Sequence, residues 1–479
     1  MVEVLLIGAG VSGLCVAARL REAGVASFVI LEKAATLGGT WRDNRYPGCA
    51  CDIPAHLYSY SFEPNPAWSR MFAPQGEILA YLQRMAERRD LVSRIRFGQE
   101  VASLRWDDGA GCWNVRTRGG EHHVARHVVS ALGALHHPAL PRLPGLDRFE
   151  GPRFHSATWN DDVDLAGQRV AVIGTGASAI QFVPTIVDRV SRLHVFQRTP
   201  PWILPKVNPV FDARRQWRFR NLPLYRRWFR SRLFLVHEER VGGFTGDRAR
   251  MVAVERLARR HLERQVPDPV LRARVTPDYA IGCKRLLISS DWYPALQKPH
   301  AEVVADAIAE VTSNGITTAD GTTRPVDVLI FGTGFDTQNN LTRLDVRGRD
   351  GASLAERWQG GASAYLGTLV AGFPNLYVML GPNSGLAHNS QIFMIEAQAN
   401  VVLYCLRRGG RSRVAVEVRQ EVQEAFNRGL AARLAKSVWQ AGGCHNWYQD
   451  GSGRNTISWP GTSLEFWWRT RWARRGDFR

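Results

Sequence analysis

Two stretches of this chain share a pattern of four apolar residues followed by a glycine-rich turn. The first is Val4–Ile7 with the turn residues Gly8, Gly10, Ser12 and Gly13, and the second is Val170–Ile173 with the turn residues Gly174, Thr175, Gly176, Ala177 and Ser178. Each turn opens a segment with helical periodicity, the context that distinguishes a dinucleotide-binding βαβ unit from an ordinary glycine turn. In such a unit the glycines let the backbone approach a pyrophosphate at the N-terminus of the helix. The repeat therefore predicts two dinucleotide sites; the alternative is two doubly wound units that bind no nucleotide.

The two copies differ at the residue that ends each unit. Aligned without a gap, Glu32 falls opposite Arg198. This position, about 20 residues beyond the glycines, meets the ribose of the adenosine. A carboxylate there accepts hydrogen bonds from the ribose hydroxyls, whereas an arginine suits a 2′-phosphate. The predicted cofactors are therefore FAD in the first unit and NADP in the second.

The chain is long enough for more than one hydrophobic core. At 479 residues, with 45% hydrophobic and 22% charged residues, it is typical of a globular protein of two or three domains. We predict an α/β fold with two Rossmann-like dinucleotide-binding domains, for FAD and NADP, and an inserted helical subdomain. The expected FAD domain comprises residues 1–140 and, together with the C-terminal segment, 326–479. The expected NADP domain comprises 141–210 and 275–325, separated by the helical insertion at 211–274.

Several short apolar runs predict the remaining strands. Alternating patterns at Val101–Trp106, Cys112–Thr117 and His123–Val129, separated by glycine and aspartate turns, indicate a small meander. Two later runs, at 326–331 and 376–380, are expected to rejoin the sheet of the first domain, which would make the FAD domain discontinuous.

The net charge of +18 raises the question of an acidic partner. Only five of the 62 basic residues are lysine, an arginine bias that can reflect genome composition as easily as function. The dense segment 214–240, interleaved with aromatic residues, favours a solvated helical face, and a membrane-surface contact is the alternative. No nucleic-acid partner and no metal site are predicted, and the oligomeric state stays open. No apolar run reaches the length of a membrane span and no basic signal region precedes the first strand, so a cytoplasmic protein is expected.

The seven cysteines are scattered and odd in number, which predicts reduced thiols. Cys49 and Cys51 form a C-x-C pair. Flavin disulfide reductases carry a cysteine pair beside the flavin, usually with wider spacing, so a redox pair is the weaker interpretation here.

Three segments resemble one family of flavoproteins. Residues 38–52, GGTWRDNRYPGCACD, are similar to the GxWxxxxYPGxxCD stretch of type I Baeyer–Villiger monooxygenases. Residues 149–159, FEGPRFHSATW, match the FxGxxxHxxxW fingerprint of that family, although Asn160 stands where the family usually has Pro or Asp. Residues 331–336, FGTGFD, resemble a late motif of flavin monooxygenases. With the two glycine turns, the resemblance covers residues 4 to 336.

The resemblance implies a set of site residues. Arg285 would be the catalytic cation beside the flavin, Asp52 the carboxylate that orients it, and Lys284 a contact to the 2′-phosphate of NADP. Further cofactor contacts are implied, or expected from position, at Gly39, Thr40, Trp41, Tyr58, Val101, Thr199 and Trp447, and His155 is placed near the domain junction.

The implied reaction is NADPH- and O₂-dependent Baeyer–Villiger oxidation of a ketone substrate to an ester or lactone, via a C4a-peroxyflavin. An arginine suits this chemistry because it stays protonated and can stabilise the developing oxyanion. Two alternatives remain open: a flavin-dependent heteroatom or carbon hydroxylase on the same fold, and a peripheral membrane-binding protein with a vestigial flavin site.

Overall fold

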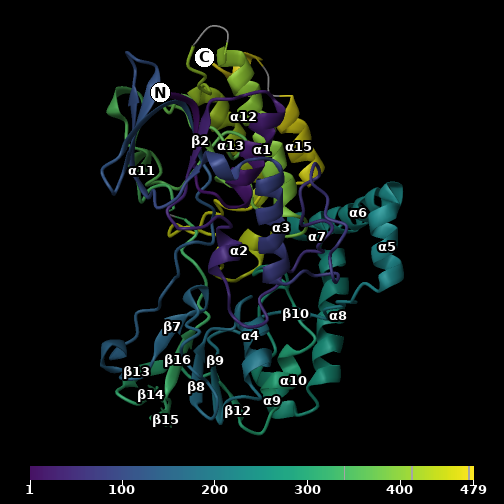
Figure 1. The fold of residues 1–479 in the computed structure, drawn as a ribbon. Helices are drawn as coiled ribbons and strands as arrows, with labels where there is room; N and C mark the ends of the chain where they lie inside the picture. The colour runs from purple at the N-terminus through teal and green to yellow at the C-terminus, as the bar shows by residue number, and fades with distance from the viewer. Residues whose placement is uncertain (339, 411–413, 473–474) are drawn as a thin grey trace.

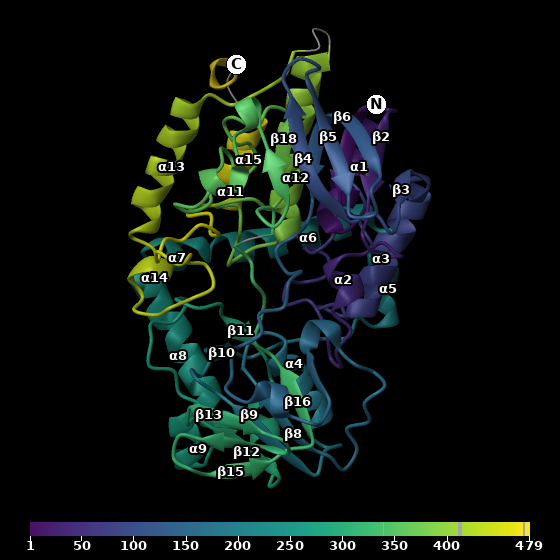
Figure 2. The same ribbon diagram turned by 90° about the vertical axis from the view of Figure 1, so that its left-hand side faces the viewer.

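The computed structural model describes residues 1–338, 340–410, 414–472 and 475–479, and it has two lobes, each built on its own sheet (Figures 1 and 2). The segment predicted as a helical insertion, residues 211–274, lies on the right-hand side in Figure 1, from the level of the junction between the lobes down beside the second lobe. The α/β fold class with two Rossmann-like units is confirmed.

The sheet of the first lobe has eight strands in the order β17-β4-β5-β6-β1-β2-β3, with β18 paired to β6. The strands are β1 Val2–Ile7, β2 Phe28–Leu31, β3 Ile95–Arg96, β4 Val101–Asp107, β5 Cys112–Thr117, β6 His122–Ser130, β17 Asp345–Arg347 and β18 Leu376–Val378. β1 is central and runs parallel to both β2 and β6, and β4, β5 and β6 form the predicted antiparallel meander. The central position explains why Val4–Ile7 of β1 are all apolar, because a parallel strand covered on both faces is buried on both sides.

The sheet of the second lobe is fully parallel, in the order β12-β9-β8-β16-β7. Its strands are β7 Arg153–His155, β8 Arg169–Ile173, β9 Arg192–Phe196, β12 Ala301–Val304 and β16 Val328–Phe331. Beside them lie an antiparallel sheet and a two-stranded parallel pair: β13 Ile308–Thr312, β14 Gly315–Thr318 and β15 Thr323–Pro325 in the first, and β10 Ile203–Leu204 and β11 Leu287–Ile288 in the second.

The predicted placement of 326–331 in the first sheet is wrong. This run forms β16, which pairs with β8 and β7 in the second lobe. Its register is set by Asp327, which accepts hydrogen bonds from the backbone and the guanidinium of Arg169 at the start of β8. A fully apolar strand fits the centre of either sheet, so the pattern alone does not choose between them. The other late strand, β18, does join the first sheet as predicted.

Helices cover both sheets. In the first lobe they are α1 Val11–Glu22, α2 Thr40–Asp43, α3 Gln75–Arg88, α11 Leu354–Arg357, α12 Gln391–Gly410, α13 Gln420–Leu434 and α15 Ser463–Arg471, whereas α14 Val438–Ala441 packs on the helical segment. The second lobe carries α4 Ala179–Ile186 and α10 Trp292–Leu296, and short 3₁₀ turns lie at Val92–Arg94, Leu146–Arg148, Ser156–Thr158, Arg349–Gly351 and Arg475–Asp477. No helix in the described ranges is both long and apolar enough to cross a membrane.

The residues predicted as a helical insertion form five helices: α5 Ala213–Asn221, α6 Pro223–Glu238, α7 Val241–Thr245, α8 Arg248–Gln265 and α9 Pro269–Arg274. Three of them begin at an aspartate whose carboxylate accepts a backbone N–H of the first turn, namely Asp212, Asp247 and Asp268. Such N-caps satisfy donors that a helix cannot pair internally. Proline at the first turn of α6 and α9 adds to these start signals.

One disulfide corrects the expectation of reduced thiols. Among the described residues, Cys283 and Cys444 are bonded, and the other five cysteines are free and buried. A count of cysteines and their spacing carries no information about a pair 161 residues apart that only the tertiary fold brings together. Cys49 and Cys51 are not bonded to each other, and burial raises the pKa of the Cys49 thiol to about 11, which disfavours a reactive thiolate there.

Candidate active site

A cavity of about 1540 Å³ is lined by residues of both lobes and reaches both glycine turns. Most pockets for a single small ligand have a volume of roughly 300–1,000 Å³, so this one has room for larger ligands. The predicted residues that line it are Gly8, Gly10, Ser12, Glu32, Gly39, Thr40, Trp41, Asp52, Tyr58, Val101, Gly174, Thr175, Gly176, Ala177, Ser178, Arg198, Thr199, Lys284, Arg285 and Trp447. Gly13 is the exception: a Cβ on it would collide with the carbonyl of Gly8, so it serves the close packing of α1 on β1.

The first glycine turn is open because side chains are excluded from it. Gly8 has a φ of +104°, and a Cβ there would lie 2.7 Å from the carbonyl oxygen of Ala131. Gly10 and Gly39 meet backbone to backbone, since a Cβ on Gly39 would lie 3.0 Å from the Cα of Gly10. The backbone above the carboxyl end of β1 is therefore bare, as a pyrophosphate site requires.

Glu32 lies directly after β2 and is buried. Its carboxylate accepts hydrogen bonds from the backbone N–H of Ala9 at 2.8 Å and of Ala34 at 3.0 Å. It also accepts one from Arg42, at 3.0 Å, and this arginine was not among the predicted residues. These contacts fix the carboxylate at the edge of the cavity, the position expected of a ribose ligand.

The second glycine turn repeats the geometry of the first. Gly174 also has a φ of +104°, and a Cβ there would lie 2.6 Å from the carbonyl oxygen of Gly332. The turn after β16, which contains the FGTGFD motif, thus covers Gly174 as the turn after β6 covers Gly8. Arg198 lies just after β9, the place that Glu32 takes after β2.

Lys284 lies near Arg198 on the cavity wall. Burial, and next the neighbouring positive charge of Arg198, lower the pKa of Lys284. The ammonium also lies 4.8 Å from the centre of the Tyr279 ring. Two cations that repel each other beside a cavity form a natural site for a phosphate dianion.

Arg285 and Asp52, 233 residues apart in the sequence, form an ion pair. The Nη2 and Nε atoms of Arg285 donate to one carboxylate oxygen of Asp52 at 2.5 and 3.1 Å. The charge of Asp52 raises the pKa of Arg285 above its ordinary value, although burial acts in the opposite direction. Each side chain is 29% exposed, so the guanidinium is both anchored and accessible from the cavity.

Aromatic residues line the cavity close to this pair. The indole nitrogen of Trp41 donates to the hydroxyl of Tyr58 at 3.1 Å, and their rings are 5.6 Å apart at 74°. Trp447 is 40% exposed, whereas its neighbour Tyr448 is buried beside Arg285. Tyr448 is a cavity-lining residue that the sequence did not reveal.

His155 packs at the connection between the lobes. Its ring lies 5.7 Å from that of Phe335, and burial lowers the pKa of His155 to about 4, so the ring is neutral. The two connecting chains run side by side here, since Ala139 donates a backbone hydrogen bond to Gly334 and Asp336 donates one to His137. The implied location of His155 near the domain junction agrees with this packing.

Gln181 fastens the YPG segment of the first lobe to the second. It lies on α4, accepts a hydrogen bond from the Tyr46 hydroxyl at 2.9 Å and donates one to the Ala50 carbonyl at 3.0 Å. A Cβ on Gly48 would lie 2.7 Å from the Gln181 carbonyl oxygen, which explains the glycine in this segment. No local signal marks a glutamine on a helix as an interdomain contact.

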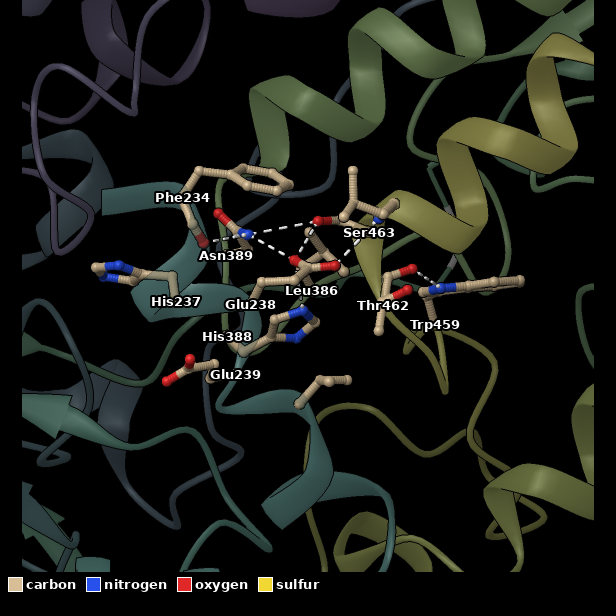
Figure 3. Close-up of polar contacts among 12 residues, drawn as sticks. Phe234, His237, Glu238, Glu239, Leu386, His388, Asn389, Trp459, Thr462 and Ser463 are labelled. Atoms are coloured by element: carbon tan, nitrogen blue, oxygen red, sulfur yellow. Dashed lines mark hydrogen bonds and ion pairs between the residues drawn. The ribbon is translucent and has the colours of Figure 1, made fainter. Parts of the chain in front are cut away.

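The loop before α12, residues 386–389, contributes to the cavity wall and is held by a buried carboxylate (Figure 3). Glu238, at the end of α6, accepts hydrogen bonds from Asn389 Nδ2 at 2.7 Å and Ser463 Oγ at 2.5 Å. The Nε2 atom of His388 lies 3.5 Å from the same carboxylate. Burial alone would raise the pKa of Glu238, but these neighbours lower it to about 2. The helical segment, α15 and the cavity loop are thereby joined at one point.

Comparisons with known proteins agree with this geometry. Residues 2–217 match the family model of flavin-binding monooxygenase-like proteins. A Baeyer–Villiger monooxygenase of Pseudomonas aeruginosa is 49% identical over 471 residues, which cover 98% of this chain and 89% of that protein. This chain belongs to the Baeyer–Villiger monooxygenases.

Solved structures of the family have the same fold. A crystal structure of OTEMO in complex with FAD and NADP superposes with a TM-score of 0.90 at 27% identity, covering 100% of this chain and 99% of that one. The closed crystal structure of cyclohexanone monooxygenase gives 0.89 at 29% identity, with 100% and 98% coverage, and its open structure gives 0.87 at 30% identity, with 100% and 99% coverage. The cavity described above therefore lies in a fold that this chain shares with the solved Baeyer–Villiger monooxygenases.

Proposed function

We propose that this protein uses FAD, NADPH and O₂ to oxidise a ketone to an ester or lactone. The observation that carries the proposal is the Arg285–Asp52 ion pair, which is accessible from a cavity that also reaches two glycine turns of equal geometry. The cytoplasm remains the proposed location, since the reaction consumes NADPH.

The residues present fit both cofactors. The backbone at Gly8, Gly10 and Gly39 carries no side chains and leaves room for the pyrophosphate of FAD, and the carboxylate of Glu32 can accept hydrogen bonds from the ribose hydroxyls of FAD. At the second turn, Gly174 leaves the same room, and Arg198 and Lys284 supply cations for the 2′-phosphate of NADP. Other residues of the cavity wall are proposed as further contacts to the two cofactors: Ser12, Thr40, Trp41, Tyr58, Val101, Thr175–Ser178, Thr199 and Trp447.

The protein's own groups carry the electrostatic part of the reaction. Bound flavin supplies the electron transfer and oxygen activation when NADPH and O₂ are present. Arg285 stays protonated throughout, because Asp52 stabilises its charge. Its N–H groups can then donate to the oxygen of the ketone as that oxygen gains negative charge. Asp52 fixes the guanidinium in one orientation through two hydrogen bonds, so no reorganisation is needed at that moment.

The first experiment compares ketone and sulfide oxidation by the purified holoenzyme. The proposal predicts that cyclic or linear ketones are converted to esters with NADPH consumption, and that Arg285→Ala loses this activity while NADPH still reduces the flavin. A protein that makes sulfoxides, N-oxides or alcohols and no ester would be the heteroatom or carbon hydroxylase instead, because the shared fold supports both reactions.

A second candidate property belongs to α5 and α6. Residues 213–237 contain eight arginines and no acidic residue. Six large apolar side chains on this segment are exposed to solvent, and among them Trp217 is 57%, Leu224 78% and Trp228 54% exposed. We infer contact with an anionic lipid surface, which attracts arginine and takes up exposed tryptophan. A second copy of the chain is a poorer partner, since twofold contact would oppose arginine to arginine.

Co-sedimentation tests this contact. Holoenzyme should pellet with vesicles that contain phosphatidylglycerol and stay in solution with pure phosphatidylcholine. Leu224→Ser with Trp228→Ser should abolish pelleting, whereas the matched control Val270→Ser, 63% exposed on α9, should not. Equal behaviour of the patch and control variants, or binding to DNA in place of vesicles, would overturn the inference.

A further inference from the structure

The single disulfide of the described residues lies beside the proposed reaction site. Cys283 directly precedes Lys284 and Arg285, and Cys444 lies three residues before Trp447. Lys284, Arg285 and Trp447 all line the cavity. The bond therefore joins two segments. One carries Lys284, the predicted phosphate-binding cation, and Arg285, the predicted catalytic cation, and the other is the loop that carries Trp447.

The two segments are in close contact around the bond. A Cβ on Gly442 would lie 2.7 Å from the Cβ of Cys283, so only glycine fits against the bonded cysteine. The backbone N–H of Ala280 donates to the Gly442 carbonyl across the two segments, and within the C-terminal segment Asn446 Nδ2 donates to the carbonyl of Trp439 at 2.9 Å. Leu286 also packs in one hydrophobic cluster with Trp439 and Tyr448, so the disulfide adds a covalent constraint to a side of the loop that is already in contact with the Arg285 segment.

The other end of the same loop is tied to the first lobe. Asn383 and Gly385 donate backbone hydrogen bonds, each of 2.8 Å, to the carbonyls of Thr456 and Ile457. The side-chain amide of Asn383 donates to two further carbonyls of the loop, at 3.0 and 3.1 Å. The loop from 442 to 459 thus bridges the segment that carries Arg285 and the segment that follows β18.

Such a bridge limits the relative movement of the two segments that it joins. Cyclohexanone monooxygenase has been solved in a closed and in an open form, and this chain superposes on both. A covalent bond between the Arg285 segment and a loop held by the other lobe limits how far Trp447 and Tyr448 can move away from Arg285.

We propose that Cys283 and Cys444 are positioning residues, whose disulfide holds the Trp447 loop against Lys284 and Arg285 in the arrangement that binds NADP and reacts. This inference rests on the proposed function. Reduction by a dithiol would loosen the arrangement: the S–S bond breaks, the dithiol gives up two electrons and two protons, Cys283 and Cys444 become thiols, and the dithiol closes to a cyclic disulfide. Oxidised glutathione restores the bond by thiol–disulfide exchange and is itself reduced to two glutathione thiols, so the effect is reversible.

The test uses wild-type holoenzyme before reduction with dithiothreitol, after it, and after removal of the reductant and reoxidation. Titration of thiols in denaturant should give five in the oxidised protein and seven in the reduced one. The dissociation constant of NADP⁺, measured by binding without turnover, should rise about tenfold on reduction. The share of NADPH consumption that yields H₂O₂ in place of ester should also increase. Reoxidation should reverse both effects, which loss of folding would not do.

Variants separate this pair from the other cysteines. Cys283→Ser and Cys444→Ser should bind NADP⁺ like the reduced wild type and should not respond to dithiothreitol. The matched control Cys112→Ser replaces a free buried cysteine on β5, remote from the loop, and should keep the full response.

Three results would overturn the inference: seven thiols in the untreated protein, full reduction with unchanged NADP⁺ affinity, or an equal response in all three variants. Because NADP⁺ binding is measured without substrate, a protein that binds NADP⁺ in a disulfide-dependent way but makes no ester would contradict the proposed function alone.

Discussion

Asp52→Asn removes one negative charge from the cavity while keeping the shape of the side chain. In the native protein Asp52 accepts two charge-assisted hydrogen bonds from Arg285, at 2.5 and 3.1 Å. Hydrogen bonds to charged groups contribute about 1.5–3 kcal/mol and neutral ones about 1 kcal/mol, so the asparagine oxygen recovers part of the interaction. Both side chains are 29% exposed, and solvent screening reduces the difference further. A net loss of about 1–2 kcal/mol follows, which corresponds to a decrease of roughly 5- to 30-fold in ester formation.

The assay is a double-mutant cycle on kcat for ester formation. Arg285→Ala removes the cation itself and should lower kcat by about 10²–10³-fold, the usual cost of a lost oxyanion donor. Because Asp52 acts only through Arg285, the double variant should be no slower than Arg285→Ala alone. Asp345→Asn is the control, since Asp345 pairs with Arg105 and Arg347 at the edge of the first sheet and should leave the rate unchanged.

Two outcomes would refute this reasoning. If the losses of the two single variants multiply in the double variant, Asp52 has a role of its own. If Asp52→Asn slows flavin reduction by NADPH as much as it slows ester formation, the carboxylate serves cofactor binding rather than the orientation of Arg285.

Three further changes have defined outcomes. Arg198→Glu should raise the KM for NADPH about tenfold or more and leave that for NADH unchanged, because about 1.5 kcal/mol or more of phosphate binding is lost; an equal effect on both nucleotides would contradict the assignment. Lys284, whose pKa is lowered by burial and by Arg198, should lose its proton at a lower pH than a free lysine. As the pH increases, the KM for NADPH should therefore begin to rise at a lower pH than that at which a free lysine loses its proton, and Lys284→Arg should abolish that rise. Glu238, with a pKa of about 2, contributes stability that is complete above the ordinary carboxyl range and is lost as the pH falls toward 2. In a series of Tm against pH, Glu238→Gln should flatten the acid limb, and Glu238→Ala should cost about 2–4 kcal/mol at neutral pH; an unchanged acid limb in the Gln variant would disprove the linkage.

Local sequence patterns predicted the parts of the fold that are determined locally. Val4–Ile7 and Val170–Ile173 are buried central strands, and the equal φ of Gly8 and Gly174 reflects the same steep turn in both units. The charge difference between Glu32 and Arg198 could be recognised because the two units have equal internal spacing.

Long-range pairings were outside the reach of such patterns. The approach of Arg285 to Asp52 followed from the family resemblance and from no feature of either segment. The Cys283–Cys444 bond was missed, and β16 was assigned to the wrong sheet. Nothing in the local sequence of a buried cysteine or of an apolar strand identifies the distant residue or strand with which it pairs. These features depend on which segments the tertiary fold brings together.

The most direct test of the central claim is the oxidation of a ketone under ¹⁸O₂ with NADPH, followed by mass spectrometry of the product. Baeyer–Villiger oxidation predicts an ester or lactone that carries one ¹⁸O atom in its bridging position, with one NADPH consumed for each molecule formed. Unlabelled product, or consumption of NADPH that yields only H₂O₂ and no ester from any ketone, would contradict the account.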